Sequence, residues 1–247
     1  PRLAVIGSGP IGSEFAQVFS RFGVSVTVLE VADRVLPPEE PESSAALAAA
    51  FAAEGITTRC GVKIESVSRS GSGARTISLA DGSTLEVDEI LVATGRSLNG
   101  AALGLDSAGI AWTPKGVEVD PHLRTSAPWV WAAGDVVAGA PLFTHVASEM
   151  GPVAARNALG HSTDSVDLRI VPRVTFTDPE VASVGLTEAA ARAAGHTVRV
   201  GFASLADAEK AQIDGQEFGH VKVVADAGSG ELLGLSLIHI SEPTRQA

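Results

Sequence analysis

Residues 3–12 read Leu3-Ala4-Val5-Ile6-Gly7-Ser8-Gly9-Pro10-Ile11-Gly12, an apolar run that leads directly into the spacing GxGxxG. Four consecutive apolar residues are typical of a buried β-strand, and residues 13–22 have the composition of an amphipathic helix. A glycine turn between a strand and a helix is the context in which this spacing binds the pyrophosphate of a dinucleotide. The sequence therefore predicts a dinucleotide-binding turn at its start.

The residues of this turn have separate expected roles. Gly7 allows the tight turn, Gly9 lets backbone amides approach the pyrophosphate, and Gly12 permits close packing of helix and strand. Pro10 and Ile11 complete the motif at the start of the helix, whose dipole favours the charge of a phosphate. The alternative is an ordinary glycine-rich turn without a ligand.

A carboxylate follows the second expected strand, residues 24–29. Glu30 lies 18 positions after Gly12. At that place a carboxylate accepts hydrogen bonds from the adenosine ribose hydroxyls and repels a 2′-phosphate, which favours NAD over NADP. The alternative is an unrelated surface glutamate.

The composition limits the class of protein. The 247 residues are 45% hydrophobic and 19% charged, which suits a globular protein of one to three domains. A net charge of −11 opposes nucleic-acid binding, because a phosphate backbone requires clustered Lys and Arg. No apolar run approaches the roughly 18 residues of a membrane span, and no basic leader precedes the first strand. We expect a soluble, cytoplasmic protein.

The chain begins inside a strand and its only methionine is Met150, so we expect a fragment. Its single cysteine, Cys60, rules out an internal disulfide or a thiolate metal cluster within these residues. We expect Cys60 to be a small buried apolar residue and not a reactive thiol.

Three regions differ in pattern: residues 1–95, 96–163 and 164–247. The first alternates apolar runs with Ala-rich stretches and predicts an α/β domain with a doubly wound parallel sheet. Asp81-Gly82 lies between two alternating runs and predicts a hairpin turn. The strands expected here are residues 3–6, 24–29, 76–79, 84–87 and 90–93, and the helices are 13–22 and 41–55.

The second region predicts a strand at residues 129–135, which ends on Gly134-Asp135, and a helix at 145–159. The third region predicts an α+β layer. Thr187 caps an expected helix over residues 188–194, and paired strands are expected at 198–202 and 220–224.

Four blocks in this order resemble the pyridine nucleotide-disulfide oxidoreductases, the family of dihydrolipoamide dehydrogenase, glutathione reductase and mercuric reductase. The resemblance extends to about Leu237. The blocks are residues 7–14, Ala93-Thr94-Gly95-Arg96, Ala132-Ala133-Gly134-Asp135 with Phe143-Thr144-His145, and Phe176-Thr177-Asp178-Pro179-Glu180-Val181-Ala182-Ser183-Val184-Gly185.

The resemblance implies that residues 1–95 are an NAD-binding domain inserted in an FAD domain. Residues 96–163 would be the C-terminal part of that FAD domain, and residues 164–247 a truncated dimer-interface domain. The implied activity is hydride transfer between NAD(H) and FAD, coupled to a small-molecule or lipoyl disulfide in a homodimer. Two alternatives are a mercuric-reductase-like metal reductase and, for this chain alone, a nucleotide-binding module without turnover.

The resemblance also implies roles for residues near the cofactors. Gly95 and Arg96 belong to the second block. Asp135, next to Gly134, would hydrogen-bond the flavin ribitol, and the alternative is an ordinary turn residue. Glu14 would pair with a lysine beside the flavin, and the alternative is a solvated helix charge.

The helix that begins near Thr144 and His145 would point its N-terminus at the flavin pyrimidine ring, where its dipole favours the reduced, anionic flavin. Either the backbone amides or the His145 side chain would act there.

The resemblance places the redox-active cysteine pair before residue 1 and the C-terminal His and Glu pair after Leu237, so we assign no catalytic residue and no metal ligand to this chain. The tail, residues 239–247, does not fit the family. Our hypothesis is that it is translated adapter sequence joined to a truncated reading frame, so that His239 and Glu242 are not the catalytic pair.

Overall fold

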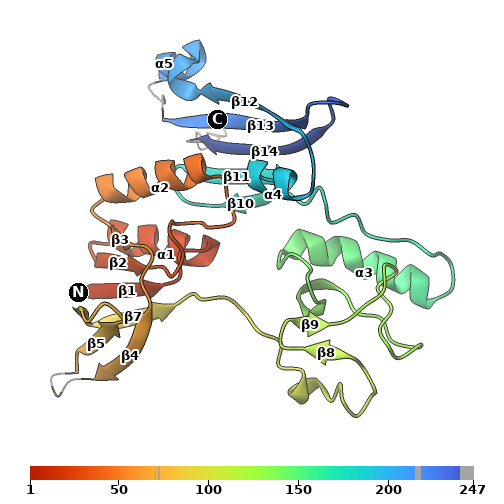
Figure 1. The fold of residues 1–247 in the computed structure, drawn as a ribbon. Coiled ribbons are helices and arrows are strands. Elements are labelled where there is room, and N and C mark those ends of the chain that lie inside the picture. The colour runs from red at the N-terminus through yellow and green to blue at the C-terminus, as the bar shows by residue number, and fades with distance from the viewer. Residues whose placement is uncertain (70, 72, 215–217, 240–247) are drawn as a thin grey trace, which may run out of the picture. The chain divides into compact units, whose positions relative to one another are not determined.

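The computed structural model describes residues 1–69, 71, 73–214 and 218–239. Contacts between residues divide the chain into two compact units (Figure 1). Unit 1 joins residues 1–95 to the segment that begins at Pro172, and unit 2 is residues 96–171. The mixed α/β and α+β class expected from the sequence is confirmed.

A parallel sheet in the order β3-β2-β1-β7 forms the centre of residues 1–95. Because β1 lies between two neighbours and both faces are covered, Ala4 and Val5 are fully buried. The strands are β1 (Arg2–Ile6), β2 (Ser25–Leu29), β3 (Thr57–Arg59) and β7 (Glu89–Val92), and the crossover helices are α1 (Pro10–Arg21) and α2 (Pro41–Ala53).

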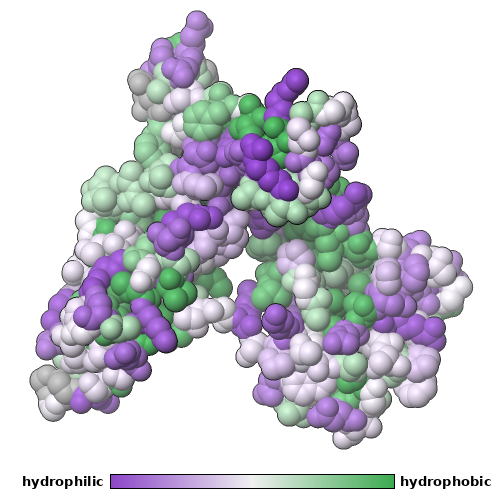
Figure 2. Space-filling view, viewed as in Figure 1, coloured by the Kyte–Doolittle hydropathy of each residue, from purple (hydrophilic) through white to green (hydrophobic). Residues whose placement is uncertain are grey.

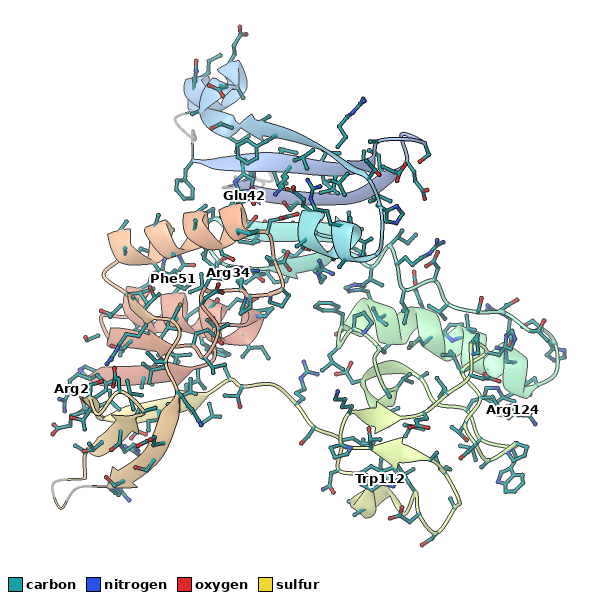
Figure 3. The ribbon with its side chains drawn as sticks, in the orientation of Figure 1. Arg2, Arg34, Glu42, Phe51, Trp112 and Arg124 are labelled. Atoms are coloured by element: carbon teal, nitrogen blue, oxygen red, sulfur yellow. The ribbon has the colours of Figure 1, made fainter. Side chains whose placement is uncertain are left out.

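The two faces of this sheet are covered differently. Alternate residues of β1 point to opposite faces, so Leu3 and Val5 pack with the helices while Ala4 packs on the other side. Leu47 and Phe51 of α2 belong to the helical side (Figure 3). The opposite side is covered by an antiparallel sheet.

That antiparallel sheet has the order β4-β5-β6. Its strands are β4 (Ile64–Arg69), β5 (Arg75–Leu79) and β6 (Thr84–Val87). The hairpin predicted at Asp81-Gly82 is confirmed, since β5 and β6 pair antiparallel and Gly82 has a φ of 82°. Ile77, Leu79 and Val87 are buried against the parallel sheet.

A second, five-stranded antiparallel sheet in the order β10-β11-β14-β13-β12 forms the rest of unit 1. The helix capped by Thr187 and the predicted pair β12 and β13 are confirmed. The elements are β10 (Arg173–Thr175), β11 (Glu180–Gly185), α4 (Glu188–Ala193), β12 (Val198–Ser204), the short helix η3 (Leu205–Asp207), α5 (Glu209–Asp214), β13 (Gly219–Asp226) and β14 (Leu232–His239).

Helix α2 lies between the two large sheets of unit 1 (Figure 1). Val181 of β11 and Ile238 of β14 belong to the same apolar core as Leu47 and Phe51 of α2. The segment from Pro172 onward is therefore packed onto residues 1–95 through a shared core.

Polar contacts also join these two parts of unit 1. Gln17 of α1 is buried and exchanges two hydrogen bonds of 2.7 Å with the backbone of Asp178. The Asp178 carboxylate pairs with Arg21 at 2.7 Å. These contacts link residues about 160 positions apart in the sequence.

Unit 2 has little regular structure apart from one long helix. Its elements are η1 (Ala101–Leu103), β8 (Trp112–Thr113), β9 (Gly116–Val117), η2 (Gly134–Val136) and α3 (Thr144–Ala158). Val146 and Met150 of α3 are buried with Leu123 and Val137. The Arg124 guanidinium lies 5.3 Å from the ring centre of Trp131 (Figure 3 labels Arg124).

The strand predicted for residues 129–135 is wrong. Trp131 forms only an isolated bridge with Arg124, and residues Gly134–Val136 form a 3₁₀ turn. A strand requires a neighbouring ladder of backbone hydrogen bonds, and the apolar run has none of that length among the described residues of unit 2. The predicted helix at 145–159 is confirmed as α3.

The sequence analysis placed the start of the tail that does not fit the family at His239. In the structure His239 is the last residue of β14 and pairs with Glu180 and Gly219. The remaining tail, 240–247, including Glu242, lies outside the described residues.

Candidate nucleotide-binding site

The glycine turn lies where β1 ends and α1 begins. Gly7 has a φ of 96°, and a Cβ there would lie 2.5 Å from the carbonyl oxygen of Ala93. A Cβ on Gly12 would lie 2.0 Å from the carbonyl oxygen of Gly7. Both positions therefore require glycine, Gly7 for conformation and contact with the β7 end, and Gly12 for the close approach of helix and turn.

Gly9 differs from the other two glycines. A Cβ built there meets no heavy atom within 4 Å. The missing side chain therefore leaves open space over the turn and fits a ligand that approaches the backbone. Gly9 is also the N-cap of α1, with Pro10 in the first turn, so a side chain does not occupy the helix N-terminus at this residue. An open helix N-terminus favours an anion.

Ile11, the remaining residue of the motif, follows Pro10 in the first turn of α1. Ile11 is 47% exposed. This arrangement fits the pyrophosphate of a dinucleotide, with the amides of the turn as donors and the helix dipole as a favourable field.

Glu30 follows β2 and is turned toward the glycine turn. One carboxylate oxygen, Oε2, accepts from the amide and the hydroxyl of Ser8 at 2.7 and 2.8 Å, and Oε1 accepts from the amide of Ala32 at 2.9 Å. Only 8% of Glu30 is exposed. It is therefore not a solvated surface glutamate.

Burial acts to raise the pKa of Glu30, but the hydrogen bonds from the amides of Ala32 and Ser8, the Ser8 hydroxyl and the amide of Val31 outweigh it and hold the pKa below its ordinary value. The carboxylate is therefore ionised near neutral pH. An ionised carboxylate accepts from ribose hydroxyls and repels a phosphate in the same place.

Ser8 is a residue of this site that the sequence interpretation missed. It lies between the first two glycines and is fully buried, and its carbonyl oxygen accepts from the Ser13 hydroxyl and the Leu36 amide. The only signal in the sequence is a hydroxyl side chain at the variable position of the motif.

Glu14, in the second turn of α1, has a backbone partner. Its Oε1 accepts from the amide of Phe176 at 2.9 Å. The interpretation of Glu14 as a simply solvated charge is therefore incomplete, because the side chain also joins α1 to the segment before β11. Its pairing with a lysine beside a flavin stays a prediction.

Gly95 ends unit 1 and Arg96 begins unit 2. Gly95 has a φ of 115°, a conformation that favours glycine. Arg96 forms an ion pair with Asp135, and both side chains are about half exposed. The structure thus brings two predicted cofactor residues of unit 2 into contact.

The remaining predicted residues meet at the start of α3. Gly134 has a φ of 76°, and a Cβ there would lie 3.0 Å from the Cβ of Ala147, so this turn packs closely on the first turns of α3. Thr144 is the first residue of α3, and the His145 ring stacks on Phe143 with 5.3 Å between ring centres. Asp135 and the α3 N-terminus therefore belong to one local structure.

Cys60 is half-buried after β3. Burial, with the nearby charges of Glu30 and Asp33, raises the pKa of its thiol, which disfavours the reactive thiolate. Within the described ranges, no group of three or more His, Cys, Asp and Glu side chains could hold a metal ion.

Comparison with known proteins agrees with this geometry. The family model described as "Pyridine nucleotide-disulphide oxidoreductase" matches residues 1–151, which is more than half of the chain. The chain belongs to this family. The dimerisation domain of the same family matches residues 171–242. The resemblance stated from the sequence is confirmed.

Dihydrolipoyl dehydrogenases and mercuric reductases are among the curated relatives of this chain. A dihydrolipoyl dehydrogenase from Chlorobaculum tepidum is 40% identical over 239 residues, which are 96% of this chain and 51% of the relative. A mercuric reductase from Staphylococcus aureus is 37% identical over 240 residues, which are 96% of this chain and 44% of the relative. The chain thus spans about half the length of the curated relatives that it matches.

Solved structures in this family have the same fold. LpdA from Mycobacterium tuberculosis matches 96% of this chain and 52% of its own chain, with a TM-score of 0.85 and 31% identity. The HOCl-induced flavoprotein disulfide reductase RclA from Escherichia coli matches 97% of this chain and 55% of its own, with a TM-score of 0.85 and 30% identity. None of the helices described in this chain is long and apolar enough to cross a membrane.

Proposed function

We propose that this chain is the NAD(H)-binding part of a flavoprotein oxidoreductase that transfers hydride between NAD(H) and FAD. In the intact enzyme, a homodimer, the electrons would pass to a small-molecule or lipoyl disulfide. The observation that carries the proposal is the ionised, buried Glu30 beside the open glycine turn. Together they offer acceptors for a ribose and donors for a pyrophosphate.

The two parts of the dinucleotide site would bind different groups of the nucleotide. The amides of the turn that contains Gly9 would bind the pyrophosphate, and Glu30 would accept from the adenosine ribose hydroxyls. A 2′-phosphate would be repelled by Glu30, so NADH is favoured over NADPH.

Unit 2 would contribute residues to the flavin-binding site. Asp135 would accept a hydrogen bond from the flavin ribitol, and the N-terminus of α3, at Thr144 and His145, would favour negative charge on the ring beside it. When bound, FAD would supply a two-electron carrier between the nicotinamide and the acceptor. The family resemblance and the open first turn of α3, whose N-cap Phe143 makes no side-chain cap, support this assignment.

The 247 residues contain one cysteine, so they cannot form a redox-active disulfide among themselves. We therefore propose that this chain alone binds nucleotide without disulfide turnover. Incubation with NADH, FAD and lipoamide should give no NADH oxidation above the rate without protein, and appreciable turnover would contradict the proposal.

A mercuric reductase activity is the second candidate, because mercuric reductases are also among the similar proteins, at 36–39% identity. The sequence of the DNA on both sides of this reading frame would separate the candidates. A CxxxxC segment after a second GxGxxG supports the family reaction, and a further terminal cysteine pair favours mercuric ion as acceptor.

Glu30→Ala tests the nucleotide assignment directly. We expect this substitution to weaken NADH binding more than NADPH binding, because it removes both the ribose acceptor and the charge that repels a 2′-phosphate. Isothermal titration calorimetry with each nucleotide measures the effect. Equal losses for NADH and NADPH would contradict the assignment.

A further inference from the structure

Ser8 makes four hydrogen bonds at the centre of the nucleotide site. Its amide and its hydroxyl both donate to Glu30 Oε2, at 2.7 and 2.8 Å. Its carbonyl oxygen accepts from the Ser13 hydroxyl at 3.0 Å and from the Leu36 amide at 3.1 Å. Ser8 is therefore fixed by its own backbone contacts and holds the carboxylate with two donors.

These contacts restrict the Glu30 side chain. A glutamate has three rotatable bonds, and holding it in one rotamer costs conformational entropy that a ligand would otherwise have to supply. Ser8 is fully buried, so its hydrogen bonds to the carboxylate are shielded from water. A hydrogen bond to an ionised acceptor is stronger than one between two neutral groups, so the two buried donors of Ser8 hold the carboxylate firmly.

The two carboxylate oxygens are held unequally. Oε2 already accepts from both donors of Ser8, whereas Oε1 accepts from the Ala32 amide at 2.9 Å.

We propose that Ser8 is a positioning residue whose hydroxyl holds the Glu30 carboxylate in place for the adenosine ribose and thereby sets the preference for NADH over NADPH. This inference rests on the proposed function. Ser8 would act through Glu30 and not through direct contact with the nucleotide.

Ser8→Ala removes the hydroxyl and keeps the backbone amide. We expect NADH affinity to fall about 2- to 10-fold, the effect of one hydrogen bond of ordinary net strength. NADPH affinity should stay the same or rise, so the NADH-to-NADPH affinity ratio should fall by at least the same factor. Calorimetric titration of the 247-residue chain with each nucleotide measures the ratio.

Ser13→Ala is the matched control. Ser13 is as fully buried as Ser8, but its hydroxyl donates to the Ser8 carbonyl and not to Glu30. Because the Leu36 amide still holds the Ser8 carbonyl oxygen and both donors to Glu30 remain, this variant should lower the ratio less than Ser8→Ala does. If Ser13→Ala lowers the ratio as much as Ser8→Ala does, general disturbance of the turn explains the effect and the inference is overturned.

The pH dependence of NADH binding is a second measurement, and a purely structural role of Ser8 would not change it. The Ser8 hydroxyl helps to keep Glu30 ionised, so NADH binding should be lost on acidification at a higher pH in Ser8→Ala than in the wild type. Identical pH profiles would argue against the inference. Ser8→Gly also removes the hydroxyl and replaces Ser8→Ala if the latter does not fold by circular dichroism.

The outcomes separate this inference from the proposed function. If the wild type prefers NADH, Glu30→Ala abolishes that preference and Ser8→Ala keeps it, only the positioning role of Ser8 is wrong. If the wild type binds neither nucleotide, or Glu30→Ala has no effect, the nucleotide assignment and the role of Ser8 both fail.

Discussion

At the scale of single residues, the three glycines of the turn are not equivalent. A Cβ on Gly12 would lie 2.0 Å from the Gly7 carbonyl oxygen, whereas a Cβ on Gly9 would meet no heavy atom within 4 Å. Substitution of Gly12 should therefore affect folding, whereas substitution of Gly9 should affect ligand binding.

Gly12→Ala should lower the free energy of unfolding by about 1–3 kcal/mol, the usual cost of forcing an extra methyl group into a packed site. Urea unfolding followed by circular dichroism measures this change. Gly9→Ala is the control and should cost less than about 1 kcal/mol, because Ala is a poorer N-cap than Gly but its Cβ meets no heavy atom there.

Gly9→Ala should nevertheless bind NADH more weakly, because its methyl group would occupy the space over the turn where the pyrophosphate approaches. Full NADH affinity in Gly9→Ala would show that the ligand does not approach the backbone there.

The close contacts of Gly7 and Gly12 and the place of Glu30 beside the turn were predictable from the sequence, because they follow from the spacing of the motif and from the position after a strand. The hydrogen bonds of Ser8 were not. They depend on a side-chain contact between residues 22 positions apart, and a single hydroxyl in a turn has no periodic signal.

At the scale of elements, a highly charged contact lies between α2, α4 and β13. The Lys222 ammonium lies within 3.0 Å of carboxylates of Glu40, Glu42 and Glu188, and both Lys222 and Glu40 are only 3% exposed. Figure 3 shows Glu42 at the N-terminal end of α2, beside the five-stranded antiparallel sheet. This group of four residues is called the Lys222 cluster.

Lys222→Met should lower the free energy of unfolding by about 3–5 kcal/mol, because it leaves the buried Glu40 carboxylate without its cation. Arg192→Met is the matched control. Arg192 pairs with the same Glu188 but is 56% exposed, so its loss should cost about 0.5 kcal/mol. Equal losses in the two variants would contradict this account of the cluster.

The cluster also predicts a dependence on pH. Burial acts to raise the pKa of Glu42, but the hydrogen bond from Lys222, the hydrogen bond from its own backbone amide and the charges of Lys222 and His220 together outweigh it and lower the pKa. Hydrogen bonds from Arg192 and Lys222 lower the pKa of Glu188. Carboxylates with lowered pKa stabilise the fold above their ordinary pKa of 4.5, and this contribution is lost as the pH falls through their folded pKa.

The difference in unfolding free energy between wild type and Lys222→Met should therefore shrink as the pH falls below about 4.5. Urea titrations at pH 7 and at successively lower pH measure it. A difference that is constant or larger in acid would mean that the carboxylates of the cluster are not the source of the stability.

Elements were predictable where an apolar run has its partner nearby or a cap is explicit, as for β1, α1 and the Thr187-capped α4. The strand expected at residues 129–135 failed because composition reports an apolar run but not the neighbour that would pair with it. The short β3, Thr57–Arg59, was missed because its three residues have no apolar signal.

At the scale of the whole molecule, the two units differ in how they are built. In unit 1, two sheets share one core through α2 (Figure 1), and unit 2 is held around the single long helix α3. Figure 2 shows apolar and hydrophilic residues mixed over the visible face of each unit.

A shared core predicts that unit 1 opens as one cooperative structure. Hydrogen exchange in Lys222→Met should therefore speed up by a similar factor in β1 and β2 as in β13, and exchange in α3 should not change. Mass spectrometry of peptides from each strand measures this. Faster exchange confined to β13 would show that the two sheets open independently.

The sequence pattern predicted three regions, but which of them share a core depends on contacts between distant residues. Gln17 and Asp178 are 161 positions apart, and Val181 and Ile238 complete a core that begins at Leu3. Such pairs have no local pattern, so the packing of the segment after Pro172 onto residues 1–95 could be seen only in the structure.

The most direct test of the account is a crystal structure of this chain soaked with NADH. We predict pyrophosphate oxygens within hydrogen-bonding distance of the backbone amides around Gly9, and adenosine ribose hydroxyls on the Glu30 carboxylate. A well-ordered chain with the nucleotide bound elsewhere, or with no nucleotide at saturating NADH, would contradict the assignment of this turn as a dinucleotide site.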